Sequence, residues 1–280
     1  MKDNMKYDIS KLKETAKLIR KDIIDMTYRC GEGHIATAFS STEIITSLYF
    51  NVLRLKPKNP DWDDRDRFIL SKGHGCYTLY SALARRGFFP LEELDTIGEY
   101  GSKFGGHPDR GLVPGIEVSS GSLGHGLSLG VGMAIAGMVD KRKSKVYVLL
   151  GDGECQEGSI WEAALFAPMH QLDNLVVIVD YNRQQAINHL DDVVRLDPFA
   201  DKWKAFGWET MQVNGHSFEE LLKAFDKIPF KAGKPSVIIA DTVKGKGVTY
   251  MEKNIIWHAR APCDKEYKQA IDEIDKKEVC

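Results

Sequence analysis

A carboxylate and a carboxamide follow two apolar runs of this sequence, and together they could bind a divalent cation. Asp152 lies in a Gly-Asp-Gly turn directly after Val146–Leu150, and Asn182 follows Asn174–Val179. Carboxylate, amide and carbonyl oxygens are the ligands that Mg²⁺ prefers, usually together with phosphate oxygens of a bound molecule. The two residues therefore predict a cation site that would also hold a phosphorylated group.

The glycines on either side of Asp152 suit such a site. Gly151 and Gly153 have no side chain, so the backbone can come close to a phosphate, and the amides that open the next helix can donate to it. Gly-Asp-Gly is also an ordinary turn, and alone it would not separate a phosphate site from a loop. The position of Asn182 at the end of a second apolar run favours the site.

The elements around these residues form a strand-helix-strand crossover. Val146–Leu150 and Asn174–Val179 are short runs of β-branched residues and leucine, while Ser159–Gln171 between them has helical character. Such units close with parallel and usually adjacent strands. Asp152 and Asn182 would then lie at the carboxyl edge of one sheet, where open α/β sheets bind ligands.

The rest of the chain has no linker or internal repeat, and we expect residues 1–280 to form a single domain. Its patterns predict helices at Ile9–Cys30, which ends at Gly31, at Leu123–Asp140 and at Asp264–Lys277, and further strands at Phe68–Leu70, Trp208–Val213 and Ser236–Asp241. The patterns Ser40-x-x-Glu43 and Ser217-x-x-Glu220 each predict a capping box that starts a helix.

Glycine is concentrated in one part of the chain. Ten of the 25 glycines fall between Gly101 and Gly132, which indicates tight backbone packing there. Gly126 and Gly130 are four residues apart on the expected helix and would let a neighbouring helix or a cofactor approach its backbone closely. A close helix crossing within this chain is the alternative to the cofactor.

Composition narrows the class of protein. The chain has 280 residues, 43% hydrophobic and 28% charged, with a formal net charge of −2, as in a globular enzyme with a substantial core. No long basic run suggests a nucleic-acid partner. The five cysteines lack metal-ligand spacing and are expected to be reduced. Residues 1–10 lack a signal-peptide core and no apolar run could span a bilayer, so we expect a cytoplasmic protein without a membrane partner.

The Gly-Asp-Gly turn, followed by 28 residues and then Asn182, resembles the fingerprint of thiamine diphosphate enzymes. Three further segments resemble the amino-terminal half of transketolase, in that family's order and spacing, and the resemblance runs from about residue 12 to 262. They are Ser71–Leu83 with SKGHG, Gly105–Ala134 with GGHP and GSLGHG, and Lys244–Pro262 with KGKG and WHARAP. The chain is thereby identified as resembling the N-terminal, diphosphate-binding subunit of a split transketolase.

This resemblance implies the fold and the cofactors. It implies an α/β, three-layer thiamine diphosphate-binding fold with a mostly parallel central sheet flanked by helices. It also implies thiamine diphosphate held through Mg²⁺, for which Ca²⁺ or Mn²⁺ can substitute. The implied metal ligands are Asp152, Asn182 and the backbone carbonyl of Gln184. The implied cofactor contacts are His74, Gly121, Ser122, Leu123, Gly151, Asp152, Gly153, Glu154, Asn182 and His258.

Four of the eight histidines lie in separate matching motifs: His34, His74, His107 and His258. Imidazoles suit a site that binds hydroxyls and moves protons near neutral pH. The resemblance implies that His74 and His258 lie near the diphosphate and the reacting carbonyl. It implies that His107 binds the first hydroxyl of a donor sugar and His34 the hydroxyl beside the cleaved bond. The other loop histidines, His170, His189 and His216, are expected to be surface or structural.

The implied reaction is the transfer of a two-carbon ketol unit from a ketose to an aldose, with the cofactor as nucleophile. In this family, the glutamate that activates the cofactor belongs to a pyrimidine-binding domain, which this sequence lacks. A second subunit with the pyrimidine-binding and C-terminal domains is therefore expected, in a heterotetramer with two copies of each chain. Alone, the chain should not turn over sugars. Glu157 is expected to reach toward the partner's glutamate, and a helix-start carboxylate favoured by the helix dipole is the alternative.

Several positions depart from the usual pattern and bear on the substrate. Ser122 and His125 differ from the common GPLGQG, and Arg183 and Gln184 follow Asn182 where Gly-Leu is common. We expect Ala36, Thr37 and Arg260 to narrow the pocket or add a cation near it, which would suit an unusual acceptor or a specialised sugar or natural-product pathway.

Two other functions compete with the split transketolase. The α subunit of a 2-oxoacid dehydrogenase shares the Gly-Asp-Gly and Asn fingerprint, but it does not account for SKGHG, GGHP and WHARAP together. A non-catalytic thiamine diphosphate-binding subunit, whose partner carries no matching active site, is the second alternative.

Overall fold

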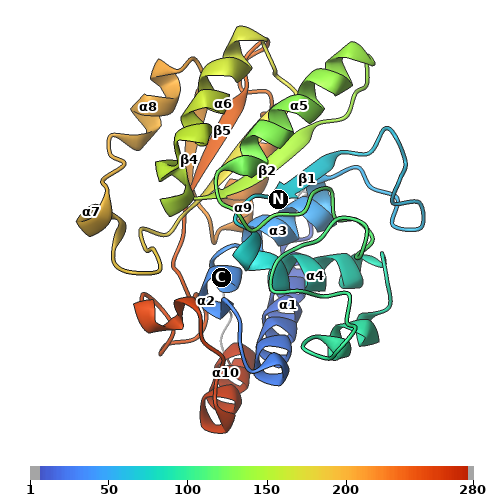
Figure 1. Ribbon diagram of the computed structural model, residues 1–280, viewed down its shortest axis with the longest axis vertical. Coiled ribbons are helices and arrows are strands. Elements are labelled where there is room, and N and C mark those ends of the chain that lie inside the picture. The colour runs from blue at the N-terminus through green and yellow to red at the C-terminus, as the bar shows by residue number, and fades with distance from the viewer. Residues whose placement is uncertain (1–6, 277–280) are drawn as a thin grey trace, which may run out of the picture.

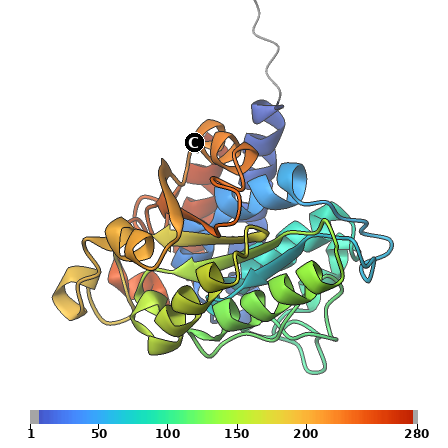
Figure 2. The ribbon, with the colours of Figure 1, turned by 90° about the horizontal axis from the view of Figure 1, so that it is seen from above.

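A parallel sheet runs through the middle of the molecule, with helices on both faces (Figures 1 and 2). The computed structural model describes residues 7–276, and within them the sheet has five strands in the order β1-β2-β3-β5-β4, every neighbouring pair parallel. The strands are β1 (Arg67–Leu70), β2 (Val146–Gly151), β3 (Leu175–Tyr181), β4 (Glu209–Asn214) and β5 (Ser236–Asp241). The predicted α/β fold with helices on both sides of a parallel sheet is confirmed.

The α-helices of the described residues are α1 (Ile9–Cys30), α2 (Ile35–Ser40), α3 (Thr42–Ser47), α4 (Cys76–Arg86), α5 (His125–Val139), α6 (Gly158–Met169), α7 (Leu190–Val193), α8 (Phe199–Ala205), α9 (Phe218–Asp226) and α10 (Asp264–Lys276). Short 3₁₀ turns lie at Gly73–Gly75, Leu91–Thr96, Gly153–Gln156 and Ile255–His258, and a π turn at Leu48–Val52. Lys277, where we expected the last helix to end, lies outside the described residues.

Strands β2, β3 and β5 are buried on both sides because helices cover both faces of the sheet. In β2, Val148 and Leu150 pack into the cluster that contains α5, α6 and α8, whereas Tyr147 and Leu149 pack into the cluster of α1 to α4, α9 and α10. This two-sided burial explains why β2 and β3 show no polar alternation. The edge strand β4 does alternate, with Met211 and Val213 packed on the core between the polar residues Thr210, Gln212 and Asn214.

The predicted crossover brings two loops to one edge of the sheet. α6 connects β2 to β3, and in the register Val146 pairs with Leu175 and Gly151 with Asp180. Asp152 follows β2 directly, and Asn182 follows β3 directly. The two residues therefore lie at neighbouring carboxyl ends, as predicted.

The ends of α1 and α9 follow the sequence signals. α1 ends at Gly31, whose φ of 72° is left-handed and suits glycine. The Ser217 side chain accepts from the Glu220 N–H, at 3.3 Å, at the start of α9.

The capping box predicted at Ser40-x-x-Glu43 is wrong. Ser40 is the last residue of α2, and its hydroxyl donates to Thr37 O and to Asp180 Oδ2. Glu43 is completely buried and binds Arg20 at 2.6 Å. Leaving a buried carboxylate without a cation costs more free energy than leaving a helix N-terminus without a cap. The ion pair with Arg20 therefore determines the position of Glu43, and the local capping pattern does not.

Gly126 and Gly130 allow α5 to lie against Ser71, which follows β1, and against the sheet, not against a second helix. A Cβ at Gly126 would be 2.9 Å from Cα of Ser71, and one at Gly130 would be 2.6 Å from Cγ2 of Val148. The close approach expected from these glycines is present. Its predicted partner within the chain, a second helix, was wrong, and the approach of a cofactor stays a prediction.

The helices and the cysteines of the described residues bear on two expectations from composition. Across residues 7–276, each helix is too short or too polar to cross a bilayer. Cys30, Cys76, Cys155 and Cys263 are free thiols, as expected, and Cys280 lies outside the described residues.

Candidate functional site

Asp152 connects the turn after β2 with the turn after β3. Its carboxylate is 2% exposed and accepts N–H groups from Gly153, at 2.7 Å, and from Arg183, at 2.5 Å. Asn182 Oδ1 accepts the Gln184 N–H at 3.0 Å. The three residues predicted as metal ligands thus belong to one hydrogen-bonded pair of turns, which offers carboxylate, carboxamide and carbonyl oxygens.

The electrostatics of Asp152 also suit a cation. Burial, and then the charge of Asp180, raises the pKa of Asp152 to about 7. A cation bound to the carboxylate would reverse this shift, because it stabilises the charged form. Residues 7–276 contain no cluster of three or more His, Cys, Asp or Glu side chains that could bind a metal ion by themselves. A metal here would rely on amide and backbone oxygens beside Asp152, which is the ligand set that Mg²⁺ accepts.

The four histidines from separate motifs meet. The His34 ring centroid lies 5.3 Å from that of His74, 6.1 Å from His107 and 5.2 Å from His258, and His74 and His258 are 5.6 Å apart. Burial is the main cause that lowers the pKa of each ring, and the pKa of His258 falls to about 3, helped by the Lys244 charge. The rings are therefore neutral near pH 7, and each can donate one hydrogen bond and accept another.

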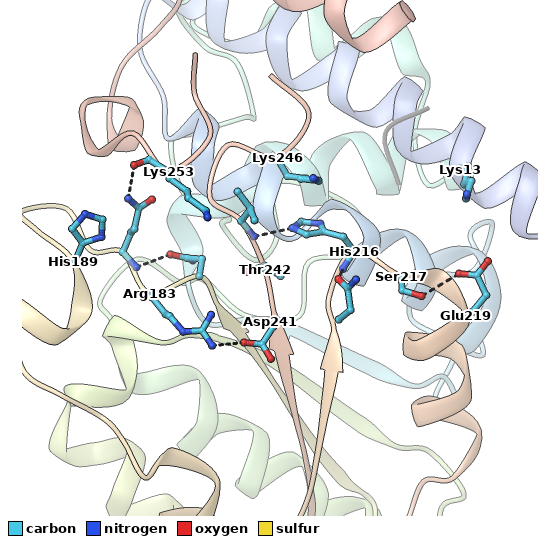
Figure 3. A pocket seen from close by; sticks show the side chains of 14 residues that line it. Lys13, Arg183, His189, His216, Ser217, Glu219, Asp241, Thr242, Lys246 and Lys253 are labelled. Carbon is cyan, nitrogen blue, oxygen red and sulfur yellow. Dashed lines mark hydrogen bonds and ion pairs between the residues drawn. The ribbon is translucent and has the colours of Figure 1, made fainter. Parts of the chain in front are cut away.

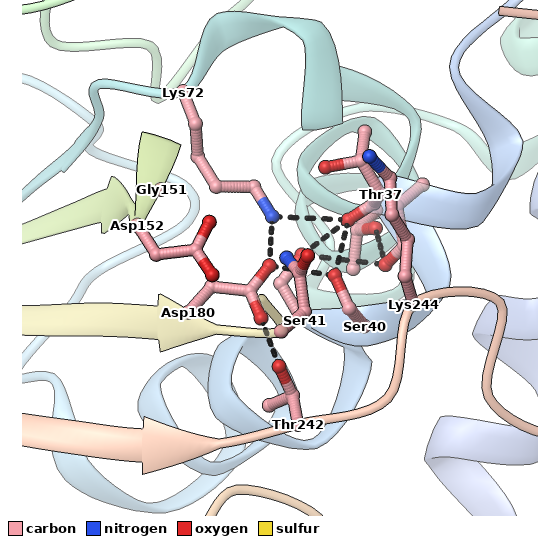
Figure 4. A network of polar contacts seen from close by, with 12 residues as sticks. Thr37, Ser40, Ser41, Lys72, Gly151, Asp152, Asp180, Thr242 and Lys244 are labelled. Carbon is pink, nitrogen blue, oxygen red and sulfur yellow. Dashed lines mark hydrogen bonds and ion pairs between the residues drawn. The ribbon is translucent and has the colours of Figure 1, made fainter. Parts of the chain in front are cut away.

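A buried network that sequence reasoning missed supports these histidines (Figure 4). Asp180, near the end of β3, binds Lys72 Nζ and the hydroxyls of Ser40 and Thr242. Lys72 also donates to Thr37 O at 3.1 Å. Burial alone would raise the pKa of Asp180, but the charge and hydrogen bond of Lys72 lower it. The signal was an aspartate within the apolar run VVIVDY and a lysine inside SKGHG.

Lys244 is a second buried lysine that sequence reasoning did not single out, although it begins KGKG. Its Nζ donates to the carbonyls of Gln184 and Gln185 and lies 2.8 Å from Nδ1 of His258. Burial lowers its pKa to about 8, against the opposing pull of Asp152. Lys244 therefore joins the predicted metal loop to the histidine cluster.

Glu154 joins three loops of the site. Its carboxylate accepts from Ser71 Oγ at 2.5 Å, from the Gly124 N–H at 2.9 Å and from the Gly151 N–H at 3.0 Å. Burial raises its pKa, and these hydrogen bonds oppose that effect. In the structure, Glu154 holds the surrounding loops together, and its predicted contact with the cofactor stays a prediction.

The GSLGHG loop lies against His107. A Cβ at Gly121 would come 3.3 Å from the His107 ring. The loop borders a hollow of about 290 Å³ whose lining includes Gly121, Ser122 and His125, and the latter two are exposed. Leu123 is half-buried beside them. This part of the predicted site is open at the surface.

Glu157 is exposed at the start of α6. It is the N-cap residue of this helix, and its side chain makes no capping hydrogen bond. A carboxylate there is favoured by the helix dipole, so the helix-start explanation and the predicted interface role both fit its position.

The departures from the family pattern have different surroundings. The Thr37 hydroxyl lies 3.3 Å from Nε2 of His74 and so borders the cluster, and Ala36 is completely buried. The Arg260 guanidinium binds both oxygens of Glu266 and lies over the ring of Trp257. Arg260 thus lies beside His34 in a parallel backbone bridge, with its charge compensated by Glu266; its effect on the substrate stays a prediction.

The remaining histidines are surface or structural, as predicted. His170 and His189 are exposed, and His170 packs on Phe166. His216 is buried, with Nδ1 2.8 Å from Glu43 Oε2 and Nε2 accepting the Val243 N–H.

A larger cavity of about 710 Å³ opens at the carboxyl ends of β3, β4 and β5 (Figure 3). Asn182 and Gln184 lie in its wall, together with Lys246 and Lys253. In Figure 3, Arg183 and Asp241 pair at one side of this cavity, at 2.5 Å. The predicted metal loop is thus accessible from the surface.

Buried polar atoms near the site have no hydrogen-bond partner. They are Ser120 Oγ, Gln184 Oε1 and Gln185 Nε2. Such groups usually find a partner in a complete protein site. Their position beside Gly121 and the metal loop fits the binding of a polar cofactor.

Comparison with known proteins identifies the relatives of this chain. Residues 11–274 match the family described as "Transketolase, thiamine diphosphate binding domain". The chain is 44% identical to one subunit of the apulose-4-phosphate transketolase from Phocaeicola vulgatus, over 92% of each chain. It is 40% identical to the 6-deoxy-6-sulfo-D-fructose transketolase subunit SqwG of a Clostridium species, over 95% of this chain and 96% of that one.

Whole transketolases match over part of their length. The human transketolase is 40% identical across 94% of this chain, which covers 42% of the human protein. The crystal structure of transketolase from Campylobacter jejuni superimposes with a TM-score of 0.90 and 31% identity, over 96% of this chain and 43% of that one. The chain thus spans less than half of the whole enzymes.

Proposed function

This chain belongs to the transketolase family as an N-terminal, thiamine diphosphate-binding subunit, and from this premise we propose that it works in a two-chain transketolase. The enzyme would transfer a two-carbon ketol unit from a ketose donor to an aldose acceptor. The observation that carries this proposal is the meeting of His34, His74, His107 and His258 beside the Asp152 loop. Neutral imidazoles in contact can bind neighbouring sugar hydroxyls and exchange protons with them.

The oxygen ligands support a place for the metal and the diphosphate. Asp152, Asn182 and the Gln184 carbonyl would hold Mg²⁺, and the backbone of Gly151 and Gly153 would border the diphosphate. When bound, thiamine diphosphate supplies the carbon nucleophile of the reaction.

Other residues of the chain would border the cofactor. On the diphosphate side, we assign His74, His258 and Glu154, which the buried loops already hold in place. On the pyrimidine side, we assign Gly121, Ser122 and Leu123, which lie in the open GSLGHG loop.

The histidines would share the work of handling the sugar. His107, which is exposed beside Gly121, would orient the donor through its first hydroxyl. His34, at the centre of the cluster, would bind the hydroxyl beside the broken bond and hold its proton. Thr37 Oγ1 lies 3.3 Å from Nε2 of His74 and would fix the orientation of that ring.

A partner chain is part of the proposal. Relatives that match over nearly their full length are named as subunits, and we infer that a second subunit carries the pyrimidine-binding and C-terminal domains, in a heterotetramer with two copies of each chain. Apolar side chains that are at least 45% exposed on α5 and α6 support an interface there: Leu129, Met138, Val139, Leu165, Phe166 and Met169. α5 and α6 lie side by side in Figure 1. Exposed apolar patches of this kind mark interaction sites.

Glu157, at the start of α6, would then reach toward the second subunit. We propose that the assembled enzyme works in the cytoplasm on small-molecule sugars. The named relatives act on different ketoses, apulose-4-phosphate and 6-deoxy-6-sulfo-D-fructose. The donor of this enzyme therefore has to be found among ketoses with and without an anionic group.

Co-expression with a candidate second subunit tests the function. The purified complex should transfer ketol units from at least one ketose in a panel of phosphorylated, sulfonated and unmodified sugars, with thiamine diphosphate and Mg²⁺. Either chain alone should be inactive. An Asp152→Ala complex should assemble but lose Mg²⁺-dependent cofactor binding, measured by calorimetry. A complex that binds the cofactor, decarboxylates 2-oxoacids and transfers no ketol unit would replace this proposal with the dehydrogenase alternative.

A further inference from the structure

Lys244 is buried at the edge of the site, and three acceptors hold its ammonium group. Nζ donates to the carbonyl oxygens of Gln184 and Gln185, at 3.2 and 3.4 Å, and lies 2.8 Å from Nδ1 of His258. The residue is 2% exposed, and Figure 4 shows it among the residues around Asp180. A lysine ammonium carries three N–H donors, so these acceptors complete its hydrogen bonding.

The charges nearby leave Lys244 opposite an unpaired carboxylate. Within residues 7–276, Lys244 makes no ion pair, and neither does Asp152, which accepts only backbone N–H groups. Asp180, the other buried carboxylate whose charge acts on Lys244, is already paired with Lys72. The charges of Lys244 and Asp152 act on each other, whereas the nearby Arg183 guanidinium is paired with Asp241. The Lys244 charge is therefore available to balance Asp152.

The carbonyl that holds Lys244 is also a proposed metal ligand. A divalent cation bound to Gln184 O would lie within a few Å of an ammonium bound to the same oxygen. Like charges at that separation repel strongly when they are shielded from water. Sharing this carbonyl between the metal and the ammonium group is therefore unfavourable.

We propose that Lys244 is the resident cation of the metal-free site, and that its ammonium must leave the Gln184 carbonyl when a divalent ion binds. This inference rests on the proposed metal site of Asp152, Asn182 and Gln184. It has two consequences. Before the metal binds, Lys244 holds the 182–185 turn and His258 together. Because its ammonium group competes with the metal for the Gln184 carbonyl, Lys244 also lowers the affinity of the chain for the metal.

Titration of the full chain with Mn²⁺, without cofactor, tests the competition. Lys244→Met keeps the apolar stem and removes the charge, so Mn²⁺ should bind at least about tenfold more tightly. The matched control is Lys246→Met on the same loop, because Lys246 is part-exposed and lies 3.8 Å from Glu252. Solvent screens that charge, so its removal should change the affinity by less than about twofold.

The same titration separates this inference from the metal site on which it rests. Asp152→Asn, alone and combined with Lys244→Met, should remove the binding. If the chain with and without Lys244→Met binds no Mn²⁺, the metal site and the competition both fail. If Mn²⁺ binds but Lys244→Met binds it no more tightly, or more weakly, only the competition is overturned.

A measurement on the unaltered protein avoids any effect of the substitution on folding. Acetylation of lysines, followed by peptide mass spectrometry, reports how accessible each ammonium is. Mn²⁺ should raise the labelling of Lys244 several-fold. Lys72, which is equally buried but paired with Asp180, should stay protected. Lys244 labelling that stays as low as that of Lys72 in saturating Mn²⁺ would overturn the inference.

Discussion

His34 and His258 lie edge to face, with 5.2 Å between their ring centroids, although they come from the two ends of the described chain. His34 precedes α2, whereas His258 closes the last 3₁₀ turn before α10. A backbone hydrogen bond from the Arg260 N–H to the Gly33 carbonyl, at 3.0 Å, holds the two segments together. The histidine cluster therefore forms only when the C-terminal segment has packed against the start of α2.

Removal of the His107 ring should affect the donor sugar more than the cofactor. In the assembled complex, His107→Ala should raise the KM of the ketose about tenfold, the usual effect of one lost hydrogen bond. Thiamine diphosphate affinity should stay within about twofold, because His107 is assigned to the sugar and not to the diphosphate. Steady-state kinetics and cofactor titration measure the two effects. Tyr100→Ala, at a fully exposed ring away from the proposed site and interface, is the control. Loss of cofactor affinity as large as the rise in KM would show that His107 has been assigned wrongly.

The buried ion pair of Glu43 should make stability depend on pH in the acid range. Burial alone would raise the pKa of Glu43, but Arg20 and His216 lower it to about 2, below its ordinary value of 4.5. The charged carboxylate therefore stabilises the fold above about pH 4.5, and this contribution, about 3 kcal/mol, is lost as the pH falls toward 2.

Glu43→Gln tests that contribution. The variant should lose a few kcal/mol of unfolding free energy at pH 7, because Arg20 stays buried without its carboxylate. Between pH 5 and pH 3, its stability should fall less steeply than that of the unaltered chain. Denaturant unfolding at a series of pH values measures both, with Glu14→Gln, at an exposed position of α1, as the control. Parallel stability curves for all three proteins would contradict this role of Glu43.

Two glycines of α5 should respond to alanine in opposite directions. Gly126→Ala would place a Cβ 2.9 Å from Cα of Ser71 and should cost about 1–3 kcal/mol of unfolding free energy. Gly132 lies on the same helix with nothing within 4 Å of such a Cβ. Gly132→Ala should stabilise the chain by about 0.5–1 kcal/mol through helix propensity. Thermal or denaturant unfolding measures the change in unfolding free energy of each variant. Equal changes at both positions would show that α5 does not lie so close to Ser71.

A charge on the apolar face of α6 should weaken binding of the second chain. Leu165 is 65% exposed, so Leu165→Asp should leave the fold intact and raise the dissociation constant of the complex at least about tenfold. Val194→Asp, at a comparably exposed position after α7, is the matched control. Analytical ultracentrifugation or light scattering of the mixed chains provides the measurement. Unchanged assembly of the Leu165 variant would place the interface elsewhere.

Sequence patterns predicted the parts of this molecule that depend on local signals. Strand runs such as Val146–Leu150 and the cap at Ser217 are set by residues close in the chain, and parallel closure of the crossover follows from general chain geometry. These two kinds of signal suffice to place Asp152 and Asn182 at one edge of the sheet.

The missed features depend on partners that are distant in sequence. Asp180 lies just beyond the predicted run Asn174–Val179 and was not singled out, because no residue near it in the sequence indicates Lys72 and Thr242 as its partners. Glu43 fitted a local capping pattern, but its carboxylate forms an ion pair with Arg20 instead. Gly126 indicated a close approach without showing to what. Roles of site residues that come from family resemblance, such as that of Glu157, stay predictions until they are measured.

Arg260 and Glu266 will have to be treated as one unit in any redesign of substrate range. The guanidinium is committed to the Glu266 carboxylate and the Trp257 ring, and the Arg260 backbone holds Gly33 beside the histidine cluster. An exchange of Arg260 alone would leave a partly buried carboxylate without its cation, in the segment that positions His34 and His258. Directed evolution of this enzyme should therefore sample positions 260 and 266 as paired codons.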